Sequence, residues 1–411
     1  MPLSKIKEKT PDSLRLLILP FEKFARLEAK GGILLLLFTA AALLWANSPW
    51  QAIYLQLWQN KFVIGFADIK LSKSLLHWIN DGLMAVFFFV VGLEIKRELL
   101  QGELDSLRKV ALPLAAAVGG MVAPAAIYFL LNTGTAGISG WGIPMATDIA
   151  FALGMLALLG SRAPLALKVF LTALAIIDDI GAVLVIALFY TADISWLSLL
   201  IGLAFFIAAI VVNCMGVRSA AIYILLGIGV WLGFLKSGVH ATIAGVLLAL
   251  TIPLRQGESG KEGHSLLHRM EEALHPWVTF FIIPVFALAN AGVILGGEFF
   301  SAFSNSIALG VALGLLVGKQ IGIMLFSWLA VRTGLASLPA DVSWPQIYGA
   351  SLLAAIGFTM SLFIANLAFT DEAFLVLAKV GILSASFLAA IAGLLFLWRT
   401  PTRRTPSDYK E

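Results

Sequence analysis

Four ionisable residues lie deep inside long apolar segments of the chain: Asp148, Asp178, Asp179 and Lys319. A charge at the centre of a membrane helix costs about 2.5–3.5 kcal/mol on insertion scales, so the four together oppose insertion by about 10 kcal/mol. A purely structural role does not account for this cost, because buried ion pairs are often no more stabilising than apolar side chains of similar volume. We therefore expect these residues to bind or move ions.

The spacing of these charges predicts a single layer. Asp148 lies 13 residues before the turn that starts at Ser161, and Asp178 lies 14 residues after Pro164, where that turn ends. Lys319 lies 13 residues before a basic helix end. At 1.5 Å per residue, each charge is roughly 20 Å from the same side of the membrane. Asp178 and Asp179 point about 100° apart, so they can line two walls of one cavity.

The composition places the whole protein in a membrane. Hydrophobic residues make up 60% of the 411 residues and charged residues only 13%, and the mean hydropathy is +0.95. A single cysteine, Cys214, excludes an intrachain disulfide framework and makes a thiolate metal site implausible. The net charge of +4 reflects basic residues in short loops, which orient membrane helices, so we expect membrane lipid and not nucleic acid as the partner.

Apolar segments of about 20 residues predict an all-α protein with twelve transmembrane helices. They lie near 31–47, 77–100, 109–132, 141–161, 165–191, 194–215, 219–236, 239–253, 273–297, 305–332, 345–370 and 373–398.

The distribution of Lys and Arg predicts that both termini are cytoplasmic. With the N-terminus inside, most basic residues flank the cytoplasmic ends, and the opposite side receives only Lys61, Lys70, Lys73 and Lys236. This divides the chain into a cytoplasmic N-terminal segment 1–30 without a cleavable signal, a transmembrane domain 31–399 and a cytoplasmic tail 400–411. The cytoplasmic loop 254–272 is too short for a catalytic module.

The external stretch 60–75 alternates partly between apolar and polar residues around a possible turn at Ala67 and Asp68. It is expected to be either an irregular loop or a hairpin whose edge pairs with a second copy of the chain, giving a homodimer.

Two predicted helices are interrupted in the charged layer. The segment 141–161 contains Gly142, Pro144, Thr147 and Asp148, and the segment 345–370 contains the run AIGFTMS around Gly357. Interrupted helices at corresponding positions of two halves are typical of inverted-repeat transporters, because unwound backbone is tolerated where it lines a polar cavity.

Several long motifs make the chain similar to the NhaA family of bacterial sodium/proton antiporters from about residue 31 to 399. The motifs are ATDIAFALG at 146–154, AIIDDIGA at 175–182, GKQ at 318–320, GFTMS at 357–361, ND at 80–81, VGLEIKREL at 91–99, KSGVHAT at 236–242 and LHPW at 274–277. This family is itself a standard example of inverted-topology repeats with discontinuous helices.

The resemblance implies an inner-membrane exchanger of Na⁺ or Li⁺ for about two protons, working by alternating access. It implies that Asp178 and Asp179 bind the cation, with Asp148 and Thr147 at the helix crossing as its further ligands. It also implies that Lys319 pairs with Asp178 and carries a proton. No cofactor and no soluble partner are implied.

The resemblance also implies a pH-responsive region at the cytoplasmic side. Its residues are Glu94, Arg97, Glu98, His240, Glu271, Glu272 and His275. Glu272 departs from the family motif, which has histidine there.

Two other functions were weighed from the same residues. A sodium-coupled symporter for an organic anion would need a fixed cationic anchor, for which Lys319 is the only deep candidate. An intramembrane aspartyl protease could use Asp148 and Asp178 sharing a proton, but Asp179 and Lys319 would then be surplus, and its Tyr-Asp and Gly-x-Gly-Asp signatures are absent. A transporter, not an enzyme, is therefore expected.

Overall fold

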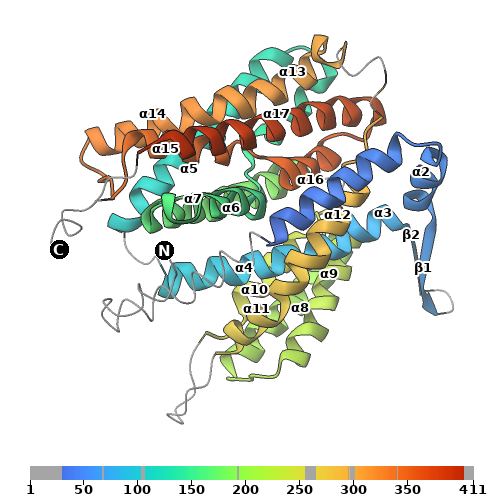
Figure 1. The fold of residues 1–411 in the computed structure, drawn as a ribbon. Helices are drawn as coiled ribbons and strands as arrows, with labels where there is room; N and C mark the ends of the chain where they lie inside the picture. Colours follow the sequence, from blue (N-terminus) through green and yellow to red (C-terminus); the bar gives the residue numbers. More distant parts are fainter. Residues whose placement is uncertain are drawn as a thin grey trace, which may run out of the picture.

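The computed structural model describes residues 30–66, 69–102, 107–191, 194–254, 265–294, 296, 301–339 and 341–401. This part of the chain is almost entirely helical, with one two-stranded hairpin (Figure 1). The first half contains a helix at Lys30–Ala46, α2 (Gln51–Gln59), β1 (Lys61–Phe66), β2 (Ile69–Ser74), α3 (Leu75–His77), the π-helix η2 (Trp78–Leu83), α4 (Met84–Gln101), α5 (Leu107–Asn132), the 3₁₀ helix η3 (Ala136–Met145), α6 (Ile149–Leu158), η4 (Gly160–Arg162) and α7 (Leu165–Phe189). The second half contains α8 (Trp196–Cys214), α9 (Ala220–Ser237), α10 (Ile243–Thr251), α11 (Leu266–Trp277), η5 (Val278–Ile282), α12 (Ile283–Asn290), η6 (Ser301–Ser304), α13 (Ser306–Leu313), η7 (Gly314–Gly318), α14 (Lys319–Arg332), α15 (Trp344–Ala354), α16 (Phe358–Ala368) and α17 (Glu372–Arg399).

Eight helices in the described part are long and apolar enough to cross a membrane, or up to eleven if each of three bent pairs counts as one span. The predicted set of twelve differs most at 239–253, where the helix α10 has only nine residues. Gly238 ends α9 in a left-handed conformation with φ of 85°, and the residues between it and Ile243 form a turn. Nine helical residues span about 14 Å, less than half of a bilayer core.

The predicted cytoplasmic loop 254–272 is also shorter than expected. Ser265 accepts a hydrogen bond from the backbone of His268 and begins α11 at Leu266. Residues 266–272 of that segment are therefore helical, because a serine N-cap satisfies a backbone donor that a helix start would leave free.

The helices form two groups (Figure 1). One group contains α5, α6, α7 and α13–α17, and the other contains α4 and α8–α12. Small residues allow the closest contact in the first group: a Cβ on Gly119 of α5 would lie 2.2 Å from the backbone oxygen of Gly322 in α14. Such contacts let two backbones approach, which is how membrane helices pack without a hydrophobic driving force.

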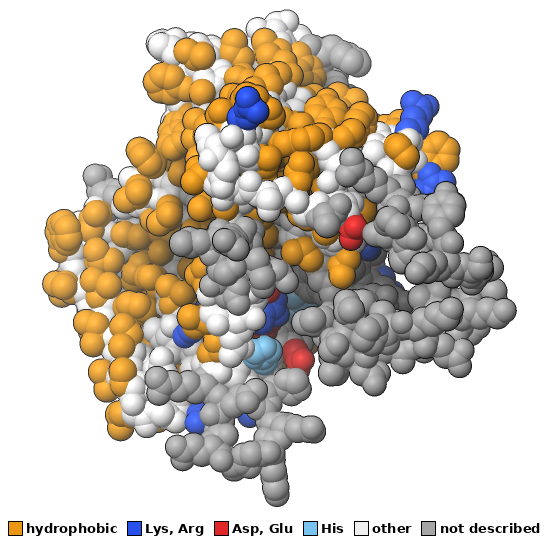
Figure 2. Space-filling view, turned by 90° about the vertical axis from the view of Figure 1, so that its left-hand side faces the viewer, with side chains coloured by type: hydrophobic (Ala, Val, Ile, Leu, Met, Phe, Trp, Pro, Cys, Tyr) orange, Lys and Arg blue, Asp and Glu red, His pale blue; other side chains and the backbone are white. Residues whose placement is uncertain are grey.

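The described residues on the face drawn in Figure 2 are largely apolar, and many large hydrophobic side chains of the described chain are exposed. The side chains of Leu44, Leu197 and Leu225, each on a long apolar helix, are at least 70% exposed. In water such a surface would be an interaction or aggregation site, whereas in a bilayer it faces lipid tails. The described chain is therefore that of a membrane protein.

The stretch 60–75 forms a hairpin and not an irregular loop. β1 and β2 pair antiparallel with Phe62 opposite Lys73, and the indole nitrogen of Trp78 donates to the backbone oxygen of Phe62 at 3.1 Å. The expected turn at Ala67 and Asp68 lies outside the described residues. The hairpin projects from one end of the molecule, which we call the hairpin end; the opposite end of α4, near Arg97, is called the charged end (Figure 1).

Candidate functional site

Two interrupted helices meet inside the first group. The chain bends by 42° between η3 and α6, where Ala146, Thr147 and Asp148 are not helical, and by 46° between α15 and α16, around Gly357. The backbone nitrogen of Asp148 donates to the backbone oxygen of Ile356 at 2.7 Å. The two breaks therefore hold each other directly, with Gly357 so close to Ala146 and Ser361 that a side chain there would collide.

Asp148 satisfies the starts of both helices that follow the breaks. Its Oδ1 accepts from the backbone nitrogen of Phe151 in α6 at 2.9 Å. Its Oδ2 accepts from the backbone nitrogen of Thr359 in α16 at 3.0 Å and from the Thr359 hydroxyl at 2.5 Å. A carboxylate is suited to this place, because helix N-termini carry unpaired N–H groups and a partial positive charge.

Lys319 reaches the breaks from a third helix. It is the first residue of α14, directly after the π-helix η7, and it is fully buried. Its Nζ donates to Asp178 Oδ2 at 2.5 Å and to the Thr147 hydroxyl at 2.9 Å. Single-turn π segments inside helices often occur at functional sites, where they turn a side chain away from the regular helical position.

Thr147 connects the pair to the unwound backbone. Its Oγ1 lies 2.6 Å from Asp178 Oδ2 and 2.8 Å from the backbone oxygen of Ala354, the last residue of α15. A hydroxyl has one hydrogen, so Thr147 donates to one of these two acceptors at a time. The residue can thus change partner without moving its oxygen.

Asp179 is buried next to this pair, and none of the described residues forms an ion pair with it. Asp178 and Asp179 are both 1% exposed on α7, and one oxygen of each, Oδ1, has no hydrogen-bond partner among the described residues. Carboxylate oxygens left open in a buried site can bind a small hard cation, which prefers oxygen ligands. The structure thus brings Thr147, Asp178 and Lys319 into contact, with Asp179 next to Asp178 in α7 and Asp148 at the crossing of the two interrupted helices. We call these five residues the buried polar centre.

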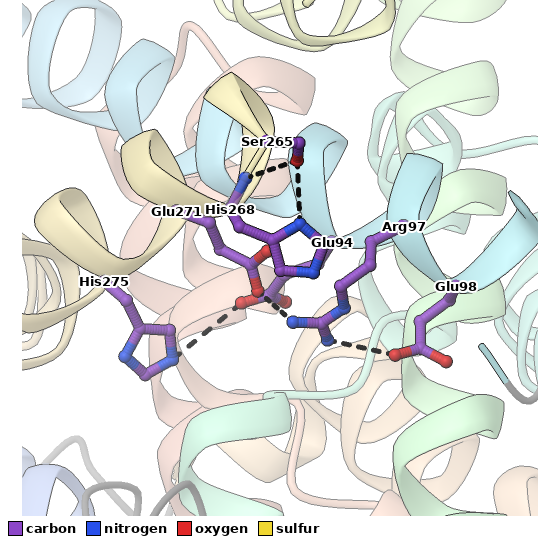
Figure 3. Close-up of polar contacts among 7 residues, drawn as sticks. All are labelled: Glu94, Arg97, Glu98, Ser265, His268, Glu271 and His275. Atoms are coloured by element: carbon purple, nitrogen blue, oxygen red, sulfur yellow. Dashed lines mark hydrogen bonds and ion pairs between the residues drawn. The ribbon is translucent and has the colours of Figure 1, made fainter. Parts of the chain in front are cut away.

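A second polar group, the charged cluster, lies at the charged end between α4 and α11 (Figure 3). Arg97 donates to Glu271 and, at 3.0 Å, to Glu98, and His275 Nε2 lies 3.8 Å from Glu94 Oε1. A small cavity of about 30 Å³ extends from Glu94 and His275 to Ile149 and Ala150, the residues that follow Asp148. The cavity therefore leads from the charged cluster toward the helix breaks.

Of the other two residues expected in the pH-responsive region, Glu272 borders this cluster, where its charge acts on Glu271, and His240 lies apart from it. Glu272 is exposed on α11, on a different side of the helix from the buried Glu271. His240 lies in the turn before α10, whose first helical turns contact Ala85 at the hairpin end of α4. Burial lowers the pKa of His240 to about 4, because desolvation disfavours the imidazolium form.

Several partners of the site were not identified from the sequence. Thr359 was noted only as part of a helix break, and Ser386 of α17, which accepts from the backbone nitrogen of Phe358 at 3.1 Å, was not singled out. His268, which contacts Ser265 beside the charged cluster, was also missed (Figure 3). The Thr in the GFTMS run was the one available signal, since a hydroxyl at a helix break often meets a charge.

The fold and the buried polar centre define a helical membrane protein that holds ionisable groups where two interrupted helices meet, as ion transporters do. The family model for "Na+/H+ antiporter 1" matches residues 22–397. The chain is 51% identical to the Na(+)/H(+) antiporter NhaA of Oleidesulfovibrio alaskensis over 94% of this chain and 95% of the relative. It is 52% identical to the antiporter of the same name from Rhodospirillum rubrum, over 93% and 98% of the two chains. The chain belongs to the Na⁺/H⁺ antiporter family.

Proposed function

We propose that this protein expels Na⁺ or Li⁺ from the cell in exchange for external protons, about two per cation, by alternating access. The observation that carries the proposal is the contact of Lys319 with Asp178 beside the unpartnered oxygen of Asp179. Family membership supports the ions, and the geometry supports the way in which they compete.

Competition follows from the position of Lys319. Its ammonium occupies Asp178 Oδ2, so a cation that takes this oxygen must displace the ammonium or find the lysine deprotonated. The Thr147 hydroxyl and the carbonyl of Ala354 lie next to the same oxygen and offer further oxygen ligands. Asp179 supplies the second carboxylate. A cation and protons thus exclude each other from one set of atoms, and each weakens the binding of the other by the same factor.

We assign the exchange of two protons per cation to Asp179 and Lys319. The cation-free centre has a carboxylate at Asp178, an ammonium at Lys319 and a proton on Asp179, a total of zero. The cation-bound centre has two carboxylates, a neutral lysine and Na⁺, a total of −1. Two protons therefore leave for each cation bound. One net charge moved through about 150 mV contributes about 3.5 kcal/mol, which supports a sodium gradient of a few hundredfold.

Alternating access is supported by the helix breaks and by the small cavity beside them. This cavity extends to Ile149 and Ala150 from the charged end, which we assign to the cytoplasm, with both termini on that side in the bacterial inner membrane. The two interrupted helices are assigned to corresponding positions of two inverted repeats, and their movement relative to α4 and α12 would expose the centre to the other side.

Regulation by pH is assigned to the charged cluster. Opposed charges on α4 and α11 titrate as a group, so their apparent pKa values belong to the cluster and not to one residue. The cluster borders the cavity that leads to the breaks, so a change in its charge can alter cation entry.

A homodimer is assigned to the hairpin. Phe62 and Val63 of β1 are more than half exposed, and a two-stranded sheet presents unpaired edges to a second copy. Deleting residues 60–72 should convert the dimer to a monomer in native mass spectrometry while the monomer still exchanges ions; an unchanged dimer would reject this assignment.

The function is tested with purified protein in proteoliposomes that carry a trapped pH dye. Addition of Na⁺ or Li⁺ on one side should move protons to that side at once, and K⁺ at the same concentration should not. Proton movement should build up a membrane potential, measured with a voltage-sensitive dye. The absence of cation-driven proton movement would exclude the antiporter, and movement that requires an added organic anion would favour the symporter.

A further inference from the structure

Three asparagines from three different elements meet on the hairpin side of the buried polar centre. They are Asn80 in η2, Asn290 at the end of α12 and Asn366 in α16. The exchange chemistry proposed above uses none of them. Asn290 is fully buried, so the network is part of the interior and not a surface contact.

The side-chain amide of Asn290 makes all four of the hydrogen bonds that it can make. Its Nδ2 donates to Asn80 Oδ1 at 2.9 Å and to the backbone oxygen of Phe286 at 3.0 Å. Its Oδ1 accepts from Asn366 Nδ2 at 3.0 Å and from Asn80 Nδ2 at 3.5 Å. Both hydrogens and both acceptor positions of this side chain are thus used, and separating the helices would leave a buried amide that only water could satisfy.

Three phenylalanines, on α4, α12 and α16, lie between the asparagines and the helix breaks. The ring of Phe363 in α16 lies 5.4 Å from that of Phe88 in α4 and 6.3 Å from that of Phe286 in α12. On α16 the order from the helix break is Thr359, Phe363 and Asn366, spaced four and three residues apart, so all three lie on one face. An ion leaving Asp148 and Thr359 toward the hairpin end therefore meets the rings first and the amides second.

The packed rings and amides on the hairpin side contrast with the charged end. There, the cavity of about 30 Å³ reaches Ile149 and Ala150 from Glu94 and His275. The rings and amides also join the two groups of helices: Asn366 and Phe363 belong to the group of α13–α17, whereas Asn290, Phe286 and Phe88 belong to the group of α4 and α8–α12 (Figure 1).

We propose that Asn80, Asn290 and Asn366 form a latch that closes the hairpin side of the ion pathway and opens once in each transport cycle between Asn290 and Asn366. The proposal rests on the proposed function, because it assigns the closed state of alternating access to named side chains. The bond between Asn80 and Asn290 stays within one group of helices and remains intact. In the open state, water that enters between α12 and α16 makes the hydrogen bonds that Asn290 loses. The three asparagines are therefore free of water when the latch is closed and hydrated when it is open.

The latch is tested by linking the helices reversibly. The chain has one cysteine, Cys214, so Cys214→Ser gives a background without thiols. The test variant adds Asn290→Cys and Asn366→Cys, and the matched control adds Asn80→Cys and Asn290→Cys. Each is reconstituted in proteoliposomes and linked with a short bis-methanethiosulfonate, and sodium-driven proton movement is measured before linking, after linking and after release with dithiothreitol.

Linking Asn290→Cys to Asn366→Cys should reduce exchange to background, and dithiothreitol should restore it, while the linked control keeps its activity. Equal activity of linked and released test protein would overturn the latch. If the Cys214→Ser parent moves no protons, the proposed function fails instead, so the two failures are distinguishable.

A second measurement covers the case in which the paired cysteines impair exchange by themselves. In the single variant Asn290→Cys, also without Cys214, a membrane-impermeant maleimide is applied from the hairpin side. Labelling should rise when a sodium gradient drives the transporter to expose its centre to that side. Residue 290 remaining unlabelled during active exchange would contradict the latch.

Discussion

Asp148 joins the starts of α6 and α16 through its hydrogen bonds to Phe151 and to Thr359, the latter 211 residues away in the sequence. The two half-helices α6 and α16 both direct their N-termini at this one carboxylate. Since neither N-terminus reaches water, the charge of Asp148 is matched by the partial positive charge of two helix ends. Its carboxylate therefore holds the crossing together.

Asp148→Ala should lower the free energy of unfolding by about 2–4 kcal/mol, because it removes the caps of two helices at about 1–2 kcal/mol each. Thr359→Val removes only the hydroxyl bond and should cost less. The measurement is thermal unfolding of both variants in the same detergent. Equal stability of Asp148→Ala and the parent would show that the caps are not needed.

Lys319→Met should destabilise the protein by about 3–5 kcal/mol, because it leaves Asp178 as a buried carboxylate without its partner. Adding Asp178→Asn should recover much of this loss, since the pair is then neutral on both sides. Lys61→Met, an exposed lysine on β1, serves as the control and should change stability by less than about 0.5 kcal/mol. Additive losses in the double variant would mean that the two side chains do not interact.

Asp179→Asn should abolish sodium-driven proton movement while the protein inserts normally and unfolds at no lower temperature. The amide keeps the shape of the side chain but cannot exchange a proton, and it replaces a buried carboxyl group whose Oδ1 has no partner in the described chain. Asp371→Asn, which removes an exposed carboxylate at the start of α17, is the matched control and should exchange normally. Full activity of Asp179→Asn would remove this residue from the cation site.

Sequence patterns predicted the long helices because 20 or more apolar residues leave few alternatives in a membrane, as at α7 and α17. They failed where helices are short. The nine residues of α10 follow α9 after a turn, and hydropathy does not distinguish a turn inside an apolar stretch from a continuing helix. The nine residues of α2 are not among the predicted spans, because they are too few to cross a membrane.

Depth along each helix predicted the meeting of Asp178 and Lys319, because rise per residue is fixed once a helix end is known. The partners of Asp148 were not predictable in this way. Thr359 and Ser386 meet the breaks through rotations and tilts of α16 and α17, which depend on packing contacts between residues hundreds of positions apart. The hydrogen bonds of the Asn290 side chain to Asn80 and Asn366 also depend on how distant helices pack.

His240 provides a prediction of pH dependence with a definite sign. Its pKa is about 4 in the folded protein and near 6.5 when unfolded, so the unfolded chain binds more protons between these values. Stability from the neutral imidazole is fully present above about pH 6.5 and is lost as the pH falls toward 4, by about 2 kcal/mol at pH 5. His240→Gln should remove this part of the acid destabilisation and leave the pH profile of exchange above pH 6.5 unchanged. The measurement is the difference in unfolding midpoint between pH 8 and pH 5 for both proteins. An equal fall in the two proteins would mean that His240 is not held neutral by burial, and a shifted exchange profile would support its place in the pH-responsive region.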